Sequence, residues 1–320
     1  MKLAIVIPIF NEEATLPVLI ERLTRACESV PDAQWTVLCV DDGSADRSVA
    51  LLAEQHERDP RFGYVRLSRN FGHQAAIAAG LAHADGDAIV VMDGDLQDPP
   101  ELIPQMVAAW RDGGQVVRAV RTRRPEVGVR GVGLKLFHWL FEKLCKLPNV
   151  GNTGVFALMD RRAADALRQL PERSRFLPGL RSWVGFDQRT VTFEREARAE
   201  GQPRQSLPRL IKYALDAFFS FTYQPLRWMT YAGLFVSATA FLIAVAFIIR
   251  RLTGAEIAVT GFTTLVTLVL FMGGIQLIAM GVLGEYIGRI FEEVKQRPLY
   301  IVGDATSLPR AAAGPASDPA

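Results

Sequence analysis

Cysteine, histidine and net charge are all scarce in this chain of 320 residues. The 3 cysteines are Cys27, Cys39 and Cys145, and their spacing matches no metal-binding motif, so reduced and buried thiols are expected. The 4 histidines are scattered along the chain, which argues against a histidine-based metal site. A net charge of +2 is too small to indicate a nucleic-acid-binding protein, and the basic residues gather near apolar segments instead.

The position of two aspartates after an apolar run indicates a candidate metal site. The apolar run Ala88–Met92 ends in Asp93 and Asp95, which are separated only by Gly94. A strand that carries Asp-x-Asp at its carboxyl end offers hard oxygen ligands, which Mg²⁺ and Mn²⁺ prefer and often share with substrate phosphates. Taken alone, the same pair is also typical of solvated loop charges or of a helix cap.

Apolar runs alternate with helical patterns in the first third of the chain. The predicted strands cover residues 3–9, 37–40, 64–67 and 88–92, and the predicted helices cover 16–27, 49–55 and 74–84. This alternation predicts an α/β fold with a largely parallel sheet, in which ligands bind beyond the carboxyl ends of the strands. Three of these strands end in acid-rich loops at that edge, namely 11–13, 41–44 and 93–95.

Several ordered motifs resemble one family. The segments IPIFNEE, VDDGSADRS and LSRNFGHQAAIAAGLAHADGDAIVVMDGDLQDPPE are similar to family 2 glycosyltransferases of the polyprenyl-phosphate branch, which includes dolichol-phosphate mannosyltransferase and bacterial undecaprenyl-phosphate glucosyltransferases. The resemblance covers residues 3–105 and resumes at GEYIGRIFEEVKQRPLYIV. It implies a glycosyltransferase-A fold (Rossmann-like, with a mostly parallel sheet) and transfer of a hexose from a nucleotide-sugar, with UDP favoured over GDP.

The resemblance also implies roles for individual residues. Glu12 would accept hydrogen bonds from the ribose, Asp41 or Asp42 from the nucleobase, and the turn before the third helix would lie near the diphosphate. The expected donor-binding residues are Pro8, Phe10, Asn11, Glu12, Asp41, Asp42, Gly43, Ser44, Arg69, Asn70, Gly72, Asp93, Gly94 and Gln97. Considered without the resemblance, residues 41–44 are also typical of an ordinary turn.

Catalysis is expected to depend on Asp95 as a direct metal ligand and on Asp93 as a contact to ribose or metal. The metal, Mg²⁺ or Mn²⁺, would neutralise the leaving diphosphate. A lipid phosphate acceptor is already an anion and needs capture by cations more than a general base. The candidates for this capture are Arg121, Arg123, Arg124, Lys135, Arg175, Arg195 and Arg198, of which Arg121, Arg195 and Arg198 are predicted to be catalytic.

Two long runs without charged residues cover 228–249 and 257–284, and each exceeds the ~20 residues that cross a bilayer. They predict two transmembrane helices, whose glycines permit association into a homo-oligomer. Basic residues flanking the two outer ends favour a cytoplasmic catalytic domain at the cell inner membrane. The first apolar run, 3–9, has the length of a strand and lacks the cleavage site of a signal peptide.

The expected organisation has four parts. Residues 1–205 form the cytoplasmic catalytic domain, and 206–227 form an amphipathic interfacial helix. Residues 228–303 form the transmembrane hairpin with a juxtamembrane helix, and 304–320 form a disordered tail rich in Ala, Pro and Ser.

The acceptor half of the motif set departs from the family pattern. Polyprenyl-phosphate members usually carry Gly-Asp-Phe-Arg-Leu where this chain has Gly154-Val155-Phe156-Ala157-Leu158, and an arginine is common where this chain has Pro178. A hydroxyl-bearing membrane lipid is therefore an alternative acceptor. A catalytically silent membrane scaffold and a transporter subunit are further alternatives, disfavoured by the intact aspartates and by the lack of charge within the spans.

Overall fold

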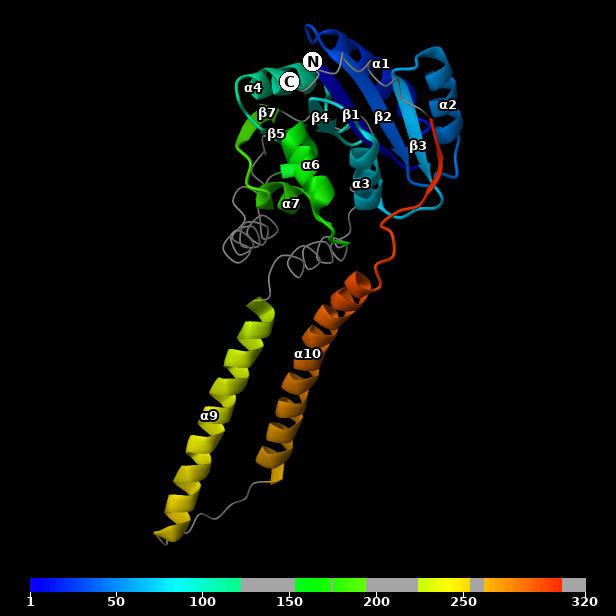
Figure 1. The fold of residues 1–320 in the computed structure, drawn as a ribbon. Coiled ribbons are helices and arrows are strands. Elements are labelled where there is room, and N and C mark those ends of the chain that lie inside the picture. Colours follow the sequence, from blue (N-terminus) through cyan, green and yellow to red (C-terminus); the bar gives the residue numbers. More distant parts are fainter. Residues whose placement is uncertain (122–152, 174, 194–223, 254–261, 307–320) are drawn as a thin grey trace, which may run out of the picture. The chain divides into compact units, whose positions relative to one another are not determined.

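The computed structural model describes residues 1–121, 153–173, 175–193, 224–253 and 262–306 (Figure 1). The chain divides into two compact units. One unit consists of Met1–Ser206 together with Arg297–Ala320, and the other consists of Leu207–Gln296.

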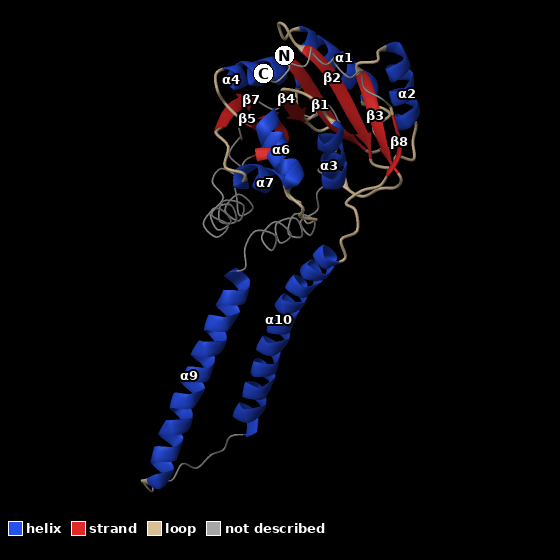
Figure 2. Ribbon diagram, in the orientation of Figure 1, coloured by secondary structure: helices blue, strands red, loops and turns tan. Residues whose placement is uncertain are grey.

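The first unit is built on an eight-stranded sheet in the order β7-β5-β6-β4-β1-β2-β3-β8 (Figure 2). Parallel pairing joins β1 to β2 and β4, β2 to β3, and β5 to β7, whereas β6 and β8 run antiparallel to their neighbours. The strands are β1 (Lys2–Ile9), β2 (Gln34–Asp41), β3 (Phe62–Leu67), β4 (Ala88–Val91), β5 (Val116–Arg121), β6 (Thr153–Asp160), β7 (Gln188–Phe193) and β8 (Val302–Ala305). The predicted α/β class with a mostly parallel sheet is confirmed.

Helices connect and cover these strands. They are α1 (Leu16–Glu28), α2 (Ser48–Arg58), α3 (His73–His83), η1 (Pro100–Leu102), α4 (Ile103–Arg111), α6 (Arg161–Gln169) and α7 (Leu177–Trp183). Each of the four predicted strands and three predicted helices is present, with ends within three residues of the expected ones. Asp46 lies two residues before α2 and accepts a hydrogen bond from the backbone N–H of Ser48, the first residue of that helix, at 3.0 Å.

Burial explains why the sheet forms. Strands β1 and β4 are almost wholly buried because helices cover both faces, which is why they read as continuous apolar runs rather than as alternating ones. Helices α1 and α4 contact each other, as do α3 and α6 (Figure 1). All strands except β6 and β8 point the same way, so loops after β1, β2, β3, β4 and β5 emerge at one edge, together with the start of β6.

The C-terminal segment differs from the expectation. Asp304 and Ala305, placed by the sequence in a disordered tail, belong to β8 and pair with β3, and the backbone N–H of Thr306 donates to Tyr64 O at 2.9 Å. Residues 297–303, predicted to continue the membrane hairpin, belong with the sheet unit. The unpaired edge of β3 supplies the backbone partners that these residues need, which no local pattern reveals. Residues 307–320 lie outside the described residues.

The second unit contains α9 (Gln224–Leu252) and α10 (Phe262–Val294). Both helices are long and apolar enough to cross a membrane, with candidate spans at Leu226–Ile243 and Phe271–Val294. Residues 224–227, assigned by the sequence to an interfacial helix, are the first residues of α9. The rest of that predicted interfacial helix, 206–223, lies outside the described residues.

Candidate active site

Two glycines bring separate loops together at the carboxyl edge of the sheet. Gly43 follows β2 with a φ of +73°, and a Cβ at this position would lie 2.6 Å from the carbonyl carbon of Arg69 and 2.7 Å from the backbone nitrogen of Asn70. A Cβ at Gly94 would lie 2.7 Å from Ile9 Cδ1. The absence of a side chain therefore lets the loop after β2 touch the loop after β3, and lets the loop after β4 touch the end of β1.

The loop after β1 is fastened to the loop after β2. The backbone N–H of Asn11 donates to Ser44 Oγ at 2.9 Å, and Asn11 Oδ1 accepts from the backbone N–H of Ala45 at 2.9 Å. Asn11 has a φ of +55°, a conformation that asparagine tolerates better than most residues. These contacts join two of the predicted donor-binding residues, Asn11 and Ser44.

The neighbouring residues of the same loop present both polar and apolar groups. Phe10 is 46% exposed, and Pro8, the last residue but one of β1, is buried and pairs with Val40. Glu12 Oε2 accepts from Thr15 Oγ1 at 2.6 Å, so the predicted ribose ligand is held at the start of α1. The loop thus offers an exposed aromatic ring beside a carboxylate.

Asp41 is enclosed rather than open to a ligand. Its carboxylate is 0% exposed and accepts from the backbone N–H of Ser44 at 3.2 and 3.3 Å. Arg66 Nε lies 3.6 Å from Asp41 Oδ2. The carboxylate therefore organises the turn that carries Gly43 and Ser44.

Asp42 serves the next loop in the same way. Its two oxygens accept from the backbone N–H groups of Phe71 at 2.7 Å and Gly72 at 2.9 Å. Burial raises the pKa of Asp42, and these two hydrogen bonds oppose the shift only in part. Nearby, the Arg69 guanidinium lies 4.2 Å over the Phe71 ring and donates to Asn70 O at 3.2 Å. Asp42 thus shapes the turn that delivers the amino end of α3.

The Asp-Gly-Asp segment lies at the centre of this edge. Asp93 Oδ1 accepts a hydrogen bond from His73 Nε2 at 2.8 Å, and the backbone N–H of Asp93 donates to Asp98 Oδ2 at 3.2 Å. The exposed Asp95 accepts from the backbone N–H of Gln97 at 3.1 Å through Oδ1. Both carboxylates predicted to bind metal are therefore at the strand end, and each retains oxygen lone pairs for a further ligand.

His73 is the residue that sequence reasoning missed. It begins α3 directly after Gly72, and its position within the LSRNFGHQ motif was the available signal. Burial acts to lower the pKa of His73, but the hydrogen bond to Asp93 and the charges of Asp93, Asp42 and Asp95 outweigh it, so the pKa is raised. The imidazole of His73, whose raised pKa favours its protonated form, thus lies near three aspartates.

A divalent cation fits this donor set only if a substrate supplies some of its ligands. Within the described ranges, no cluster of three or more histidine, cysteine or acidic residues is arranged to hold a metal ion. Asp93 and Asp95 supply hard oxygen atoms on one short segment. Mg²⁺ typically uses one or two carboxylates together with substrate phosphates and water, so these two residues suit an ion completed by a diphosphate.

Of the three arginines predicted to be catalytic, the described residues include only Arg121. Arg121 is the last residue of β5 and lies at the carboxyl edge. Arg195 and Arg198 lie outside the described residues.

The sequence matches the profile of Glycosyl transferase family 2 over residues 4–168, just over half of the chain. The chain belongs to glycosyl transferase family 2. This confirms the family predicted from the motifs, the glycosyltransferase-A-like α/β fold and the assignment as a hexosyltransferase-type enzyme.

Relatives of this glycosyltransferase match it along nearly its whole length. A protein of Synechocystis sp. described as an uncharacterized glycosyltransferase is 41% identical over 309 residues, covering 96% of both chains. The SfII prophage-derived bactoprenol glucosyl transferase of Shigella flexneri is 38% identical over 303 residues, covering 94% of this chain and 97% of the relative. Among solved structures, glucosyl-3-phosphoglycerate synthase from Mycobacterium tuberculosis with Mn²⁺, UDP and phosphoglyceric acid has a TM-score of 0.48 and 19% identity, covering 68% of this chain and 76% of that one.

The structure also locates the departure from the family pattern in this glycosyltransferase. Ala157, where an arginine is usual, pairs with Arg118 on the neighbouring strand β5. Arg118 is buried and donates through Nη2 to Thr190 Oγ1 on β7 at 3.2 Å. Arg181 on α7 is buried nearby and donates to the carbonyls of β6. Two arginines that the motifs did not single out therefore lie beside the altered segment.

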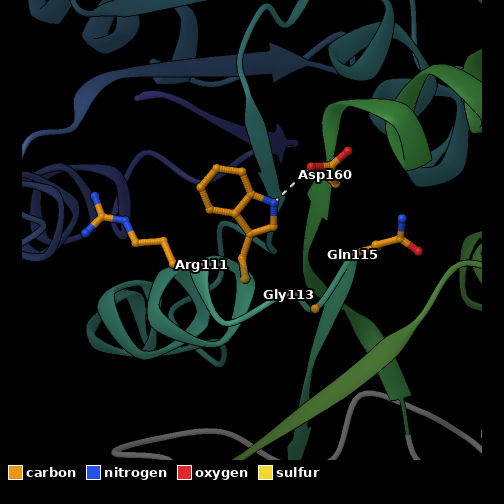
Figure 3. A pocket seen from close by; sticks show the side chains of 6 residues that line it. Arg111, Gly113, Gln115 and Asp160 are labelled. Atoms are coloured by element: carbon orange, nitrogen blue, oxygen red, sulfur yellow. Dashed lines mark hydrogen bonds between the residues drawn. The ribbon is translucent and has the colours of Figure 1, made fainter.

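A hollow at the opposite edge of the sheet does not belong to this site. It is lined by Trp110, Arg111, Gly113, Gly114, Gln115 and Asp160 (Figure 3). The Asp160 carboxylate accepts from Trp110 Nε1 at 3.1 Å and from the backbone N–H of Arg162 at 2.9 Å, so it caps α6. Gln115 immediately precedes β5, so the hollow lies at the end of that strand remote from the aspartate loops.

Proposed function

We propose that this protein is a membrane-bound, inverting glycosyltransferase that moves a sugar from a UDP-sugar to a polyprenyl phosphate such as undecaprenyl phosphate. The observation that carries the proposal is the convergence of Asp93, Asp95 and His73 with the loops after β1 and β2 at one sheet edge. The product would serve the modification of a cell-envelope glycan or lipid.

The donor would lie along these loops. Phe10 and Pro8 would line the nucleotide slot, with Glu12 accepting from the ribose hydroxyls. Asp41 and Asp42, whose carboxylates accept hydrogen bonds from the backbone, would shape the nucleobase side of the slot. The diphosphate would lie near the amino end of α3, where backbone N–H groups favour an anion.

Asp93 and Asp95 would hold Mg²⁺ or Mn²⁺. When bound, this ion supplies positive charge that neutralises the diphosphate leaving group. The Asp93 oxygen that accepts from His73 is kept in a fixed orientation by that hydrogen bond.

The acceptor chemistry follows from the charges. A phosphate oxygen attacks the anomeric carbon, and the bond between that carbon and the diphosphate oxygen breaks, so the nucleoside diphosphate leaves with the electron pair. Attack opposite the leaving group inverts the anomeric configuration. The start of β6 carries Gly154, Val155 and Phe156, where a general base for a hydroxyl acceptor is missing from the described side chains. An anionic acceptor needs no such base, and the relatives named as bactoprenol glucosyl transferases support it.

The two candidate spans support attachment to the cell inner membrane with the catalytic unit in the cytoplasm. Helices α9 and α10 would cross the bilayer and return the chain to its starting side. Arg227, Arg289, Lys295 and Arg297 lie towards the outer ends of the two helices, against Arg250 and Arg251 at the end of α9 that leads into the connection between them. An excess of basic residues near the outer ends favours placing those ends, and the catalytic unit with them, on the cytoplasmic side of the membrane. The glycines of α10 permit a homo-oligomer.

The proposal is tested by nucleotide release from detergent-solubilised protein. UDP- and GDP-sugars are each combined with and without undecaprenyl phosphate, in Mg²⁺, Mn²⁺ or EDTA. The Asp95→Asn variant should lose activity, whereas Asp112→Asn should retain it, because Asp112 forms an exposed ion pair with Arg189 remote from the site.

Release of nucleotide that requires one donor, a divalent ion and the lipid phosphate would establish the reaction and identify the sugar. If a donor binds but lipid phosphate never stimulates release, the acceptor is a hydroxyl-bearing lipid. If no donor binds, both glycosyltransferase hypotheses fail, and the catalytically silent membrane scaffold is the alternative that remains.

A further inference from the structure

Arg181 is an unusually placed cation. It lies on α7 and is 1% exposed, the largest side chain among the most deeply buried ones described. Its Nη1 donates to Val155 O and its Nη2 to Gly154 O, both at 3.1 Å. Its Nε is buried and has no acceptor among the described residues.

The charge of this guanidinium has no carboxylate partner in the described part of the chain. Burial lowers the pKa of Arg181 to about 9, and the charge of Arg118 contributes to the shift. A group with this pKa is still protonated at pH 7. A buried cation that is satisfied only by carbonyl dipoles projects positive potential into its surroundings, and this potential acts strongly where water is excluded.

The bonded carbonyls lie at the catalytic edge. Strand β6 runs antiparallel to β4, and the last pair between them is Val91 with Ala157. Asp93 lies two residues beyond Val91, and Val155 lies two residues before Ala157. Arg181 therefore holds the segment of β6 that begins beside the Asp-Gly-Asp loop.

A second contact joins the first residue of α7 to the start of α3, which itself contacts the Asp-Gly-Asp loop. Gln74 Oε1 accepts from the backbone N–H of Leu177, the first residue of α7, at 3.1 Å. Gln74 directly follows His73, which bonds Asp93. Thus α7 is joined at its start to the Asp93 side and, through Arg181, to the start of β6.

We propose that Arg181 is a positioning residue for an anionic acceptor. It acts through the Gly154 and Val155 backbone, whose position it holds, and its buried charge favours a phosphate monoester at this edge over an uncharged hydroxyl group. The inference rests on the proposed function, since it assigns Arg181 to the acceptor half of that site.

The test compares variants that separate charge from hydrogen bonding. Arg181→Met removes both, Arg181→Gln removes the charge but keeps donors, and Arg181→Lys keeps the charge. Arg168→Met is the matched control, because Arg168 also donates to two carbonyls, Leu81 O and Ala84 O, both at 2.6 Å, but at the opposite edge. For each full-length variant, the apparent KM values for undecaprenyl phosphate and for the UDP-sugar are measured beside the thermal midpoint.

We expect Arg181→Met and Arg181→Gln to raise the KM for undecaprenyl phosphate about tenfold or more while changing the donor KM less than about twofold. Arg181→Lys should stay within about threefold of wild type, and Arg168→Met should lower the thermal midpoint without changing either KM. If Arg181→Met does not fold, the contrast between the lysine and glutamine variants carries the test. Equal changes in both KM values, or an acceptor KM that none of the variants alters, would overturn the inference.

A binding measurement separates this inference from the proposed function. Retention of radiolabelled undecaprenyl phosphate and of undecaprenol by the protein in nanodiscs is measured without any donor. If wild type binds the phosphate lipid but transfers no sugar to it, the proposed function fails, and loss of that binding in Arg181→Gln still supports the inference. If wild type binds both lipids equally, the inference is wrong whatever the turnover assay gives.

Discussion

His73 donates a hydrogen bond from Nε2 to Asp93 Oδ1 at 2.8 Å, which joins the first residue of α3 to the carboxyl end of β4. The histidine side chain is 46% exposed and that of the aspartate is 33% exposed, so both are accessible from the edge where the loops converge. This contact orients one Asp93 oxygen and leaves the other available.

Loss of this contact should weaken metal-dependent catalysis. We expect His73→Ala to lower the apparent affinity for Mn²⁺ or the value of kcat/KM by roughly 10–100-fold, because outer partners orient ligating carboxylates. The measurement is nucleotide release over a Mn²⁺ titration. His83→Ala serves as the control, since His83 lies at the other end of α3, where its Nδ1 donates to Ala79 O at 2.8 Å. Equal effects from both variants would contradict the assignment.

Gly43 should not accept a side chain. Gly43→Ala places a Cβ 2.6 Å from Arg69 C at a φ of +73°, so the backbone of one loop must move. We expect UDP binding to weaken about tenfold or more, measured by calorimetry. Gly113→Ala has a similar strain at a φ of +100°, costing roughly 1–3 kcal/mol, but lies remote from the site. Unchanged UDP affinity in Gly43→Ala would show that the two loops do not form the slot.

The buried thiols should resist alkylation in the folded protein. Burial raises the pKa of Cys27 and of Cys39 from 9.0 to about 12, so neither forms thiolate at pH 8. In a Cys145→Ser background, iodoacetamide should react only after unfolding in urea. Because the folded pKa lies above the unfolded one, the stability from these neutral thiols is complete below pH 9 and is lost as the pH rises towards 12. Rapid labelling of folded protein at pH 8 would show that these positions open readily.

The C-terminal strand should contribute to stability. A chain ending at Thr306 keeps β8, whereas a chain ending at Tyr300 loses the hydrogen bonds from Ser68 N–H to Ile301 O at 2.9 Å and from Thr306 N–H to Tyr64 O at 2.9 Å. Each such bond contributes about 1 kcal/mol, so we expect only the shorter chain to show a lower thermal midpoint and to aggregate through the exposed edge of β3. Identical midpoints would mean that β8 is dispensable.

The local pattern was sufficient to predict the strand ends and the aspartate loops, because parallel strands deliver their carboxyl ends to one edge. It was not sufficient to predict what the aspartates contact. Asp41 or Asp42 is expected from the motifs to accept a hydrogen bond from the nucleobase, and the structure adds that oxygens of both residues accept from backbone N–H groups, those of Ser44, Phe71 and Gly72. Buried carboxylates need hydrogen-bond donors, and the donors for Asp42 come from a loop about thirty residues away, as the separations of 29 and 30 residues record.

The sequence by itself determined the alternating α/β order, the acidic strand ends and the two apolar helices, because hydrophobic periodicity and run length are local properties. Only the tertiary structure decided the pairing of His73 with Asp93, the burial of Arg181 against the start of β6 and the return of residues 302–305 to the edge of β3. These contacts join residues 20, 26 and more than 200 positions apart. Their formation depends on where the packed core places each loop and edge, which no short window of sequence records.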